Sequence, residues 1–153
     1  MATEAAAVSD ATNGVTGVPT TRVIAAVITR GNELLVCQRP VHKRHGGLWE
    51  FPGGKVEPDE SDEDSARREL AEELGVRVVS AGASVFETRD PGSEFLIAFV
   101  PVRVEGEPEC REHSALQWGT AEVLASLPLA PSDRRFVELL IAKGSERGDG
   151  GSS

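Results

Sequence analysis

Residues 54–76 read GKVEPDESDEDSARRELAEELGV, and this stretch decides how the chain folds. Ser61 followed three residues later by Asp64 forms a variant capping box, which marks the start of a helix. Gly75 stands where a helix typically ends, because glycine adopts the left-handed conformation without strain. The stretch therefore predicts a helix over 61–74.

This helix carries an apolar stripe and an acidic cluster. Three apolar residues recur at helical spacing and predict the face that packs on a sheet: Ala66, Leu70 and Leu74. Glu69, Glu72 and Glu73 stand at positions i, i+3 and i+4, so their carboxylates converge on one face. Like charges at this spacing destabilise a helix by some tenths of a kcal/mol per pair, which favours a solvated face or a site for cations.

Neighbouring residues favour the cation site. Pro52-Gly53-Gly54 forms a glycine turn that can present backbone carbonyls, and Arg68 can hold a carboxylate in position. Because all these ligands are oxygens, they suit hard cations such as Mg²⁺ or Mn²⁺, which prefer carboxylates and substrate phosphates.

The composition excludes several classes of protein. The chain has 153 residues, 39% hydrophobic and 27% charged, which is typical of one water-soluble domain. It has neither a membrane-length apolar run nor a secretory signal, so we expect a cytoplasmic protein without membrane contact. Cys37 and Cys110 are too few for a disulfide framework or a four-thiolate zinc site. The net charge of −9 argues against stable nucleic-acid binding.

The organisation predicts an α/β domain over residues 21–143. We expect disordered ends at 1–20 and at the Gly/Ser tail 144–153. A hairpin is predicted from strands at 23–28 and 33–38, joined by the turn Arg30-Gly31-Asn32. Further strands are predicted at 48–51, 77–79, 83–89, 95–103 and 115–118, with a last helix over 133–143. Strands on both sides of one helix, with a second helix at the end, indicate a mixed sheet between helices.

The quoted stretch resembles a complete Nudix box, G-x5-E-x7-R-E-U-x-E-E-x-G-U, in which U is a bulky aliphatic residue. Every fixed position is met, from Gly54 to Val76. The resemblance implies the Nudix α/β/α sandwich with a mixed central sheet, and hydrolysis of nucleoside diphosphates linked to another group. It also implies a divalent cation, Mg²⁺ or Mn²⁺, as cofactor.

The same resemblance implies roles for the residues of the box. Glu69, Glu72 and Glu73, with the carbonyl of Gly53, would be metal ligands. Glu69 would also orient or deprotonate the attacking water, so it is the predicted catalytic residue. Two further residues would support the geometry of loop and helix: Glu60 and Arg68.

Segments outside the box look like the MutT and CTP pyrophosphohydrolase branch, which cleaves a nucleoside triphosphate to the monophosphate and pyrophosphate. They are QRP at 38–40 and LWEFPGGK at 48–55. Glu112, six residues before Trp118, matches an additional metal ligand of that branch, although it also fits a plain loop acid. Three residues match substrate contacts: Arg39 and Lys55 for phosphate, and Phe51 for the base. Phe51 also fits the core, and Lys55 a solvated lysine.

The identity of the base stays open at this stage. Asp133, in the segment PLAPSD at 128–133, resembles the base-reading residue of the branch and also fits an N-cap of the last helix. An ionised Asp133 accepts from an amine such as cytosine N4, whereas a protonated one donates to an oxidised guanine. The basic loop His42–His45 could cover the triphosphate.

We therefore expect a nucleotide pyrophosphohydrolase that cleans the nucleotide pool, acting on 8-oxo-dGTP or on (d)CTP-type nucleotides as a monomer or homodimer. Two alternatives remain: a hydrolase of ADP-ribose or dinucleotides, and a metal- or nucleotide-binding module without catalysis. The chain has no tyrosine, and a dinucleotide substrate would favour extra aromatic stacking.

Overall fold

The computed structural model describes residues 20–151, with side chains over residues 20–144. The helices are α1 (Asp62–Leu74), α2 (Ala121–Leu124) and α3 (Pro131–Gly151). The strands are β2 (Thr21–Val27), β3 (Thr29–Arg30), β4 (Glu33–Gln38), β5 (Trp49–Glu50), β6 (Gly53–Lys55), β7 (Arg77–Ala81), β8 (Phe86–Thr88), β9 (Phe95–Glu105) and β10 (Ala115–Gly119). None of the helices over the described residues is long and apolar enough to cross a membrane.

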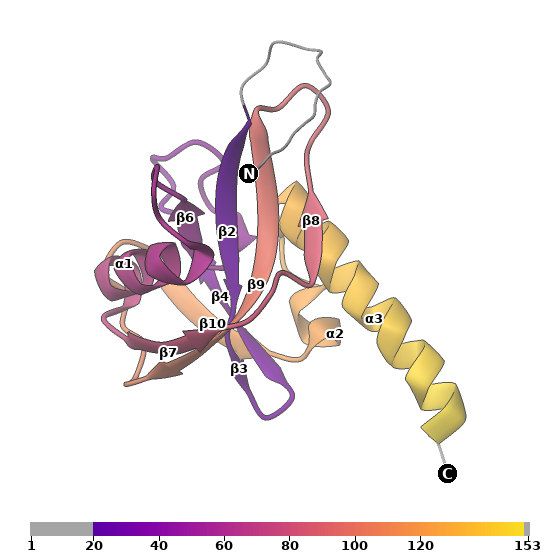
Figure 1. The fold of residues 1–153 in the computed structure, drawn as a ribbon. Helices are drawn as coiled ribbons and strands as arrows, with labels where there is room; N and C mark the ends of the chain where they lie inside the picture. Colours follow the sequence, from indigo (N-terminus) through magenta and orange to yellow (C-terminus); the bar gives the residue numbers. More distant parts are fainter. Residues whose placement is uncertain (1–19, 152–153) are drawn as a thin grey trace, which may run out of the picture.

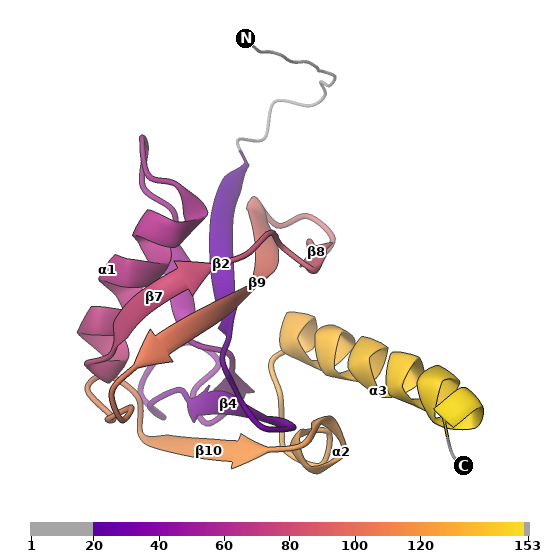
Figure 2. The same cartoon turned by 60° about the horizontal axis from the view of Figure 1, so that its bottom comes forward.

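The strands form two sheets between the helices. The larger sheet has the order β6-β2-β9-β7 with β8 also on β9, and its β2 and β9 are parallel while the other pairs are antiparallel. The smaller sheet has the order β10-β4-β3, with β5 also paired to β4. In both views α1 lies on one side of the strands and α3 on the other (Figures 1 and 2). The predicted α/β/α arrangement with a mixed sheet is confirmed.

Each side of the larger sheet has its own apolar core. The stripe Ala66, Leu70 and Leu74 of α1 is fully buried in one cluster, as predicted. In the other cluster Phe136 of α3 stacks on Phe99 of β9, with ring centroids 4.4 Å apart. Burying such a side chain contributes about 1.5–3 kcal/mol, so these contacts fix both helices on the sheet.

The predicted first hairpin is only partly correct. Only β3 pairs with β4, whereas β2 pairs with β9 and β6. The reason is that β2 is apolar on both faces: Ile24 packs in the α1 cluster and Ala25 in the α3 cluster. A strand buried on both faces belongs in the middle of a sheet, not at its edge.

The last helix is longer than predicted at both ends. It begins at Pro131, where the fixed φ of proline suits the first helical position. It continues to Gly151, so the predicted Gly/Ser tail 144–153 is helical over most of its length. No proline follows Pro131, and each glycine costs only about 1 kcal/mol in a helix. The predicted N-terminal tail lies outside the described residues, apart from Thr20.

Candidate active site

The acidic helix begins and ends where the sequence predicts. Ser61 is the N-cap, its hydroxyl accepts from the N–H of Asp64, and the Asp64 carboxylate accepts from the N–H of Ser61. Gly75 ends the helix in the left-handed conformation, with a φ of 70°. These caps fix the position of the three glutamates between them.

The glycine turn before the helix is in part a strand. Gly53 and Gly54 belong to β6, which pairs with β2. Gly53 has a φ of +152°, and a Cβ there would lie 2.1 Å from the carbonyl oxygen of Ile24. A Cβ on Gly54 would lie 2.3 Å from Oε2 of Glu69. Only glycines therefore let β6 approach both the sheet and the Glu69 carboxylate this closely.

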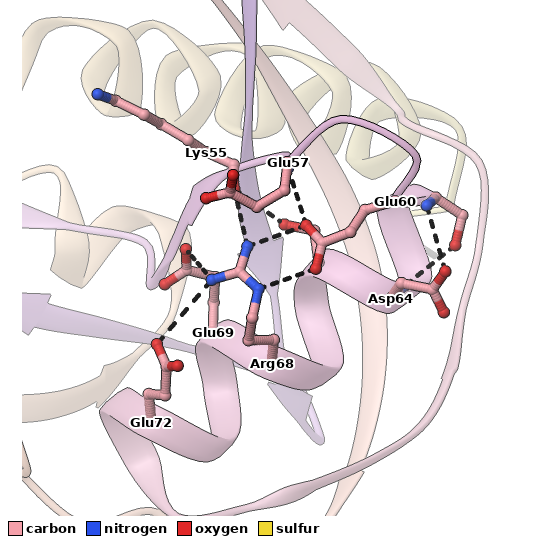
Figure 3. A network of polar contacts seen from close by, with 9 residues as sticks. Lys55, Glu57, Glu60, Asp64, Arg68, Glu69 and Glu72 are labelled. Carbon is pink, nitrogen blue, oxygen red and sulfur yellow. Dashed lines mark hydrogen bonds and ion pairs between the residues drawn. The ribbon is translucent and has the colours of Figure 1, made fainter.

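Arg68 binds the loop to the helix (Figure 3). Its Nε and Nη2 donate to the two carboxylate oxygens of Glu60 at 2.8 and 2.9 Å, and Nη2 also donates to the Lys55 carbonyl at 3.1 Å. These hydrogen bonds, with that from the Glu57 N–H, lower the pKa of Glu60 to about 2. Glu60 and Arg68 thus join the loop before α1 to the helix, and their role in the activity stays a prediction.

The same guanidinium reaches the acidic cluster. Nη1 of Arg68 donates to Oε2 of Glu69 at 3.1 Å and lies 4.0 Å from Oε1 of Glu72 (Figure 3). Glu72 is exposed, whereas Glu69 is mostly buried. In this structure Arg68 is thus the cation between two of the predicted metal ligands.

Glu73 is the buried member of the cluster. The residue is 5% exposed, and its Oε1 accepts from the N–H of Gly53 at 3.3 Å. Burial raises the pKa of Glu73 well above its usual range, and the adjacent Glu69 carboxyl adds to this. The charge of Glu112 acts in the same direction.

Glu112 lies in the loop 106–114, which precedes β10. The N–H groups of Glu109 and Arg111 donate to the carbonyls of Leu74 and Glu73 at the end of α1. The N–H of Ser114 donates to the carbonyl of Gln38 on β4. Glu112 is exposed between these anchors.

The donors present fit a hard divalent cation. Three features support the fit: the Glu73 carboxyl is buried next to that of Glu69, all available donors are oxygens, and Gly54 has no Cβ to fill the space beside Glu69. Over residues 20–144, however, no three Asp, Glu, His or Cys side chains are already grouped closely enough to hold an ion. Glu69 and Glu72 turn toward Arg68 instead.

A cleft of about 720 Å³ opens next to this cluster. Three predicted substrate residues line it: Arg39, Lys55 and Asp133. Of the basic loop, Arg44 and His45 line the cleft. Gly54 forms part of the wall, so the carboxylate of Glu69 lies beside the cleft.

Phe51 does not line this cleft. Its side chain is buried in the core, edge-on to Phe99 and Phe136 at centroid distances of 5.7 and 5.5 Å. The structure therefore supports its core alternative and does not bring its ring to the predicted place under the base. Its backbone contributes instead, because the N–H of Phe51 donates to Oδ1 of Asp133 at 3.0 Å.

Asp133 is not the N-cap of the last helix, since α3 already begins at Pro131. Its carboxyl is turned to β5 and the cleft by the hydrogen bond from Phe51. Burial raises the pKa of Asp133 to about 7, and the charge of Glu50 also raises it. The carboxyl can thus exist in both protonation states near neutral pH.

Sequence reasoning missed Glu50. Its carboxylate lines the cleft, accepts from Nη1 of Arg39 at 3.2 Å and lies 3.1 Å from Nε2 of His113. The available signal was a charged residue between Trp49 and Phe51 in a short apolar strand.

Comparisons with known proteins agree with this geometry. The family model for the NUDIX domain matches residues 19–140. The CTP pyrophosphohydrolase of Escherichia coli is 38% identical over 122 residues, which cover 78% of this chain and 90% of the relative. A putative 8-oxo-dGTP diphosphatase 2 of Mycobacterium tuberculosis is 38% identical over 118 residues, covering 75% of this chain and 84% of the relative.

Solved structures show the same fold. The solution structure of the Escherichia coli ORF135 protein is 37% identical, with a TM-score of 0.73 over 88% of this chain and 98% of that one. A MutT structure from work on Aliivibrio salmonicida and Vibrio cholerae is 31% identical, with a TM-score of 0.69 over 81% of this chain and 98% of that one. Because both the family model and these structures cover most of its length, the chain belongs to the NUDIX family and is a Nudix hydrolase.

Proposed function

We propose that the chain is a divalent-metal-dependent pyrophosphohydrolase that converts nucleoside triphosphates of the 8-oxo-dGTP or (d)CTP type to the monophosphate and pyrophosphate. The observation that carries this proposal is the pair of the half-buried Glu69 and the buried Glu73 beside a cleft with cationic and carboxyl side chains. The names of the relatives, a CTP pyrophosphohydrolase and 8-oxo-dGTP diphosphatases, agree with it.

Glu69, Glu72, Glu73 and the Gly53 carbonyl would hold the cation, which we propose is Mg²⁺ or Mn²⁺, with Glu112 as a further ligand. When bound, the cation would neutralise phosphate charge and make a water molecule more acidic. Glu69 is the proposed base because its carboxylate is held by Arg68 and lies against Gly54 at the cleft.

The cleft supports a triphosphate bound through cations. The Arg39 guanidinium lines it, and this planar group matches phosphate oxygens. Lys55 also lines it, with its Nζ 5.4 Å from the ring centroid of Phe95. Among the described residues that line the cleft, Phe95 is the one phenylalanine and neither tyrosine nor tryptophan joins it, which supports a single base over a dinucleotide.

Asp133 is the proposed reader of the base. The bond from the Phe51 N–H holds its carboxyl by Oδ1. In the ionised form Asp133 would accept from cytosine N4, and in the protonated form it would donate to an oxygen of 8-oxoguanine. A pKa of about 7 leaves both forms available, so the assay below includes both kinds of base.

We further propose that the protein acts on free nucleotides in the cytoplasm and so contributes to the protection of DNA. The net charge of −9 supports a small substrate over a polymer of phosphates.

The test is phosphate release in the presence of Mg²⁺, with added pyrophosphatase for 8-oxo-dGTP, dCTP, 5-methyl-dCTP and dGTP. ADP-ribose is assayed with added alkaline phosphatase, because its hydrolysis yields AMP and ribose 5-phosphate and no pyrophosphate. We expect turnover of at least one of the first three, with the Glu69→Gln variant slowed more than about 100-fold. Glu122→Gln, the same exchange at an exposed residue of α2, is the matched control and should keep full activity. Turnover of ADP-ribose alone, or of none of the five, would refute the proposal.

A further inference from the structure

His113 is a buried histidine that the proposed chemistry leaves unused. Its side chain is only 8% exposed. Nε2 lies 3.1 Å from Oε2 of Glu50, and since a carboxylate accepts, the geometry assigns a proton to Nε2. Nδ1 is buried without a hydrogen-bond partner in the part of the chain that the structure describes. The bond to Glu50 is therefore the polar contact that holds this ring.

This bond spans the smaller sheet. Glu50 of β5 pairs with Cys37 on one edge of β4, and Leu116 of β10 pairs with the same Cys37 on the other edge. His113 stands just before β10, so its contact with Glu50 joins the two strands that flank β4. Glu50 in turn accepts from Arg39 at the cleft, which makes a continuous chain of polar contacts.

The residue next to His113 is Glu112, the proposed metal ligand of the loop. Backbone hydrogen bonds of Arg111 and Ser114 fix that loop on either side, and neither holds Glu112 itself. Glu112 is exposed, so burial does not fix it either. Two adjacent side chains hold it: the exposed Arg111 guanidinium donates to the Ala71 carbonyl of α1 at 3.4 Å, and the buried His113 ring contacts Glu50 on the other side.

We infer that His113 is a positioning residue of the active site: its hydrogen bond to Glu50 holds the loop 106–114 so that Glu112 stays at the end of α1, where the adjacent Arg111 N–H donates to the Glu73 carbonyl. The inference rests on the proposed function through the role given to Glu112. A group that orients a metal ligand in this way typically changes metal affinity by about 10- to 100-fold when it is removed.

The experiment measures Mn²⁺ binding to nucleotide-free protein by electron paramagnetic resonance. His113→Leu removes the bond, and we expect it to weaken Mn²⁺ binding roughly tenfold. It also removes the unpartnered Nδ1, so the melting temperature should change little. His113→Gln can place an amide N–H near the position of Nε2 and should restore binding to within about threefold of the wild type. His113→Asn is the matched control, since its shorter amide corresponds to Nδ1 and should bind as weakly as the leucine variant.

Glu112→Gln completes the test. If His113 acts through Glu112, adding His113→Leu to Glu112→Gln should weaken Mn²⁺ binding no further. Equal weakening in both backgrounds, no loss in His113→Leu, or no effect of Glu112→Gln would each overturn the inference. Should His113→Leu fail to fold, equal binding by His113→Gln and His113→Asn would overturn it instead.

Pyrophosphate release by the wild type separates this inference from the proposed function. A wild type that binds Mn²⁺ and loses affinity in the His113 variants, yet releases no product, would refute the function and leave the positioning role intact. Normal turnover by the wild type, with unaffected Mn²⁺ binding in the His113 variants, would support the function and refute the positioning role.

Discussion

The Asp133→Asn variant isolates what one buried carboxyl contributes to the pH dependence of folding. In the native protein Asp133 has a pKa of about 7, against an ordinary value of 3.8. The folded protein therefore keeps this proton over a pH range in which the unfolded chain has released it. It follows that the wild type loses stability as the pH rises from about 4 to about 7, because folding then requires either proton uptake or a buried charge.

The size of the effect follows from the two pKa values. Each unit of difference corresponds to about 1.4 kcal/mol, and roughly two units of the shift take effect between about pH 5 and about pH 8. Asparagine keeps the oxygen that accepts from the Phe51 N–H but cannot ionise. The free energy of unfolding of Asp133→Asn, relative to that of the wild type, should therefore be ~2.5 kcal/mol higher at about pH 8 than at about pH 5.

Urea denaturation of both proteins at the two pH values measures this gain. Asp59→Asn is the matched control, since Asp59 is exposed and its left-handed φ of 72° also suits asparagine. The free energy of unfolding of Asp59→Asn should differ from that of the wild type by the same amount at both pH values. If the free energy of unfolding of Asp133→Asn also differs from the wild type by the same amount at both pH values, Asp133 does not carry a raised pKa and the reasoning is refuted.

Three further substitutions test the geometry of the site and of the fold. Gly54→Ala places a Cβ 2.3 Å from the Glu69 carboxylate, so kcat should fall more than about 100-fold in the phosphate-release assay. Arg68→Lys keeps the charge but loses the bidentate hydrogen bond to the Glu60 carboxylate, so kcat in the same assay should fall about 10-fold or more. Phe136→Ala removes the ring stacked on Phe99, so urea denaturation should show a loss of about 3–5 kcal/mol.

Matched changes outside the site serve as controls for these variants. Gly144→Ala adds a Cβ with nothing within 4 Å, and Arg67→Lys alters the neighbouring arginine, which pairs with Glu63. Both should keep wild-type turnover. An active Gly54→Ala would show that Glu69 can move without loss, and a Phe136→Ala variant of normal stability would show that α3 is not held by this stack.

Local signals made much of the fold predictable. The α1 helix follows from Ser61, Asp64 and Gly75, whose preferences depend only on neighbours along the chain. Strand pairing was less predictable from the sequence, because β2 and β9 are parallel partners about 70 residues apart and no local pattern specifies that contact. The short helix α2, with Thr120 as its N-cap, is too brief to show a helical period.

In the candidate site, too, local features were predictable from the sequence and contacts between distant strands were not. The glutamates of α1 were predictable because helical spacing alone places them on one face. The contact between Glu50 and His113 was not, since it depends on β5 and β10 lying on opposite edges of β4 in a particular register. A shift of one residue in either strand would turn one of these side chains to the other face of the sheet. The register of the smaller sheet therefore joins the cleft to the loop 106–114. If Glu112 of that loop is a metal ligand as proposed, variants on β4 that disturb strand pairing should alter Mn²⁺ affinity without changing a ligand.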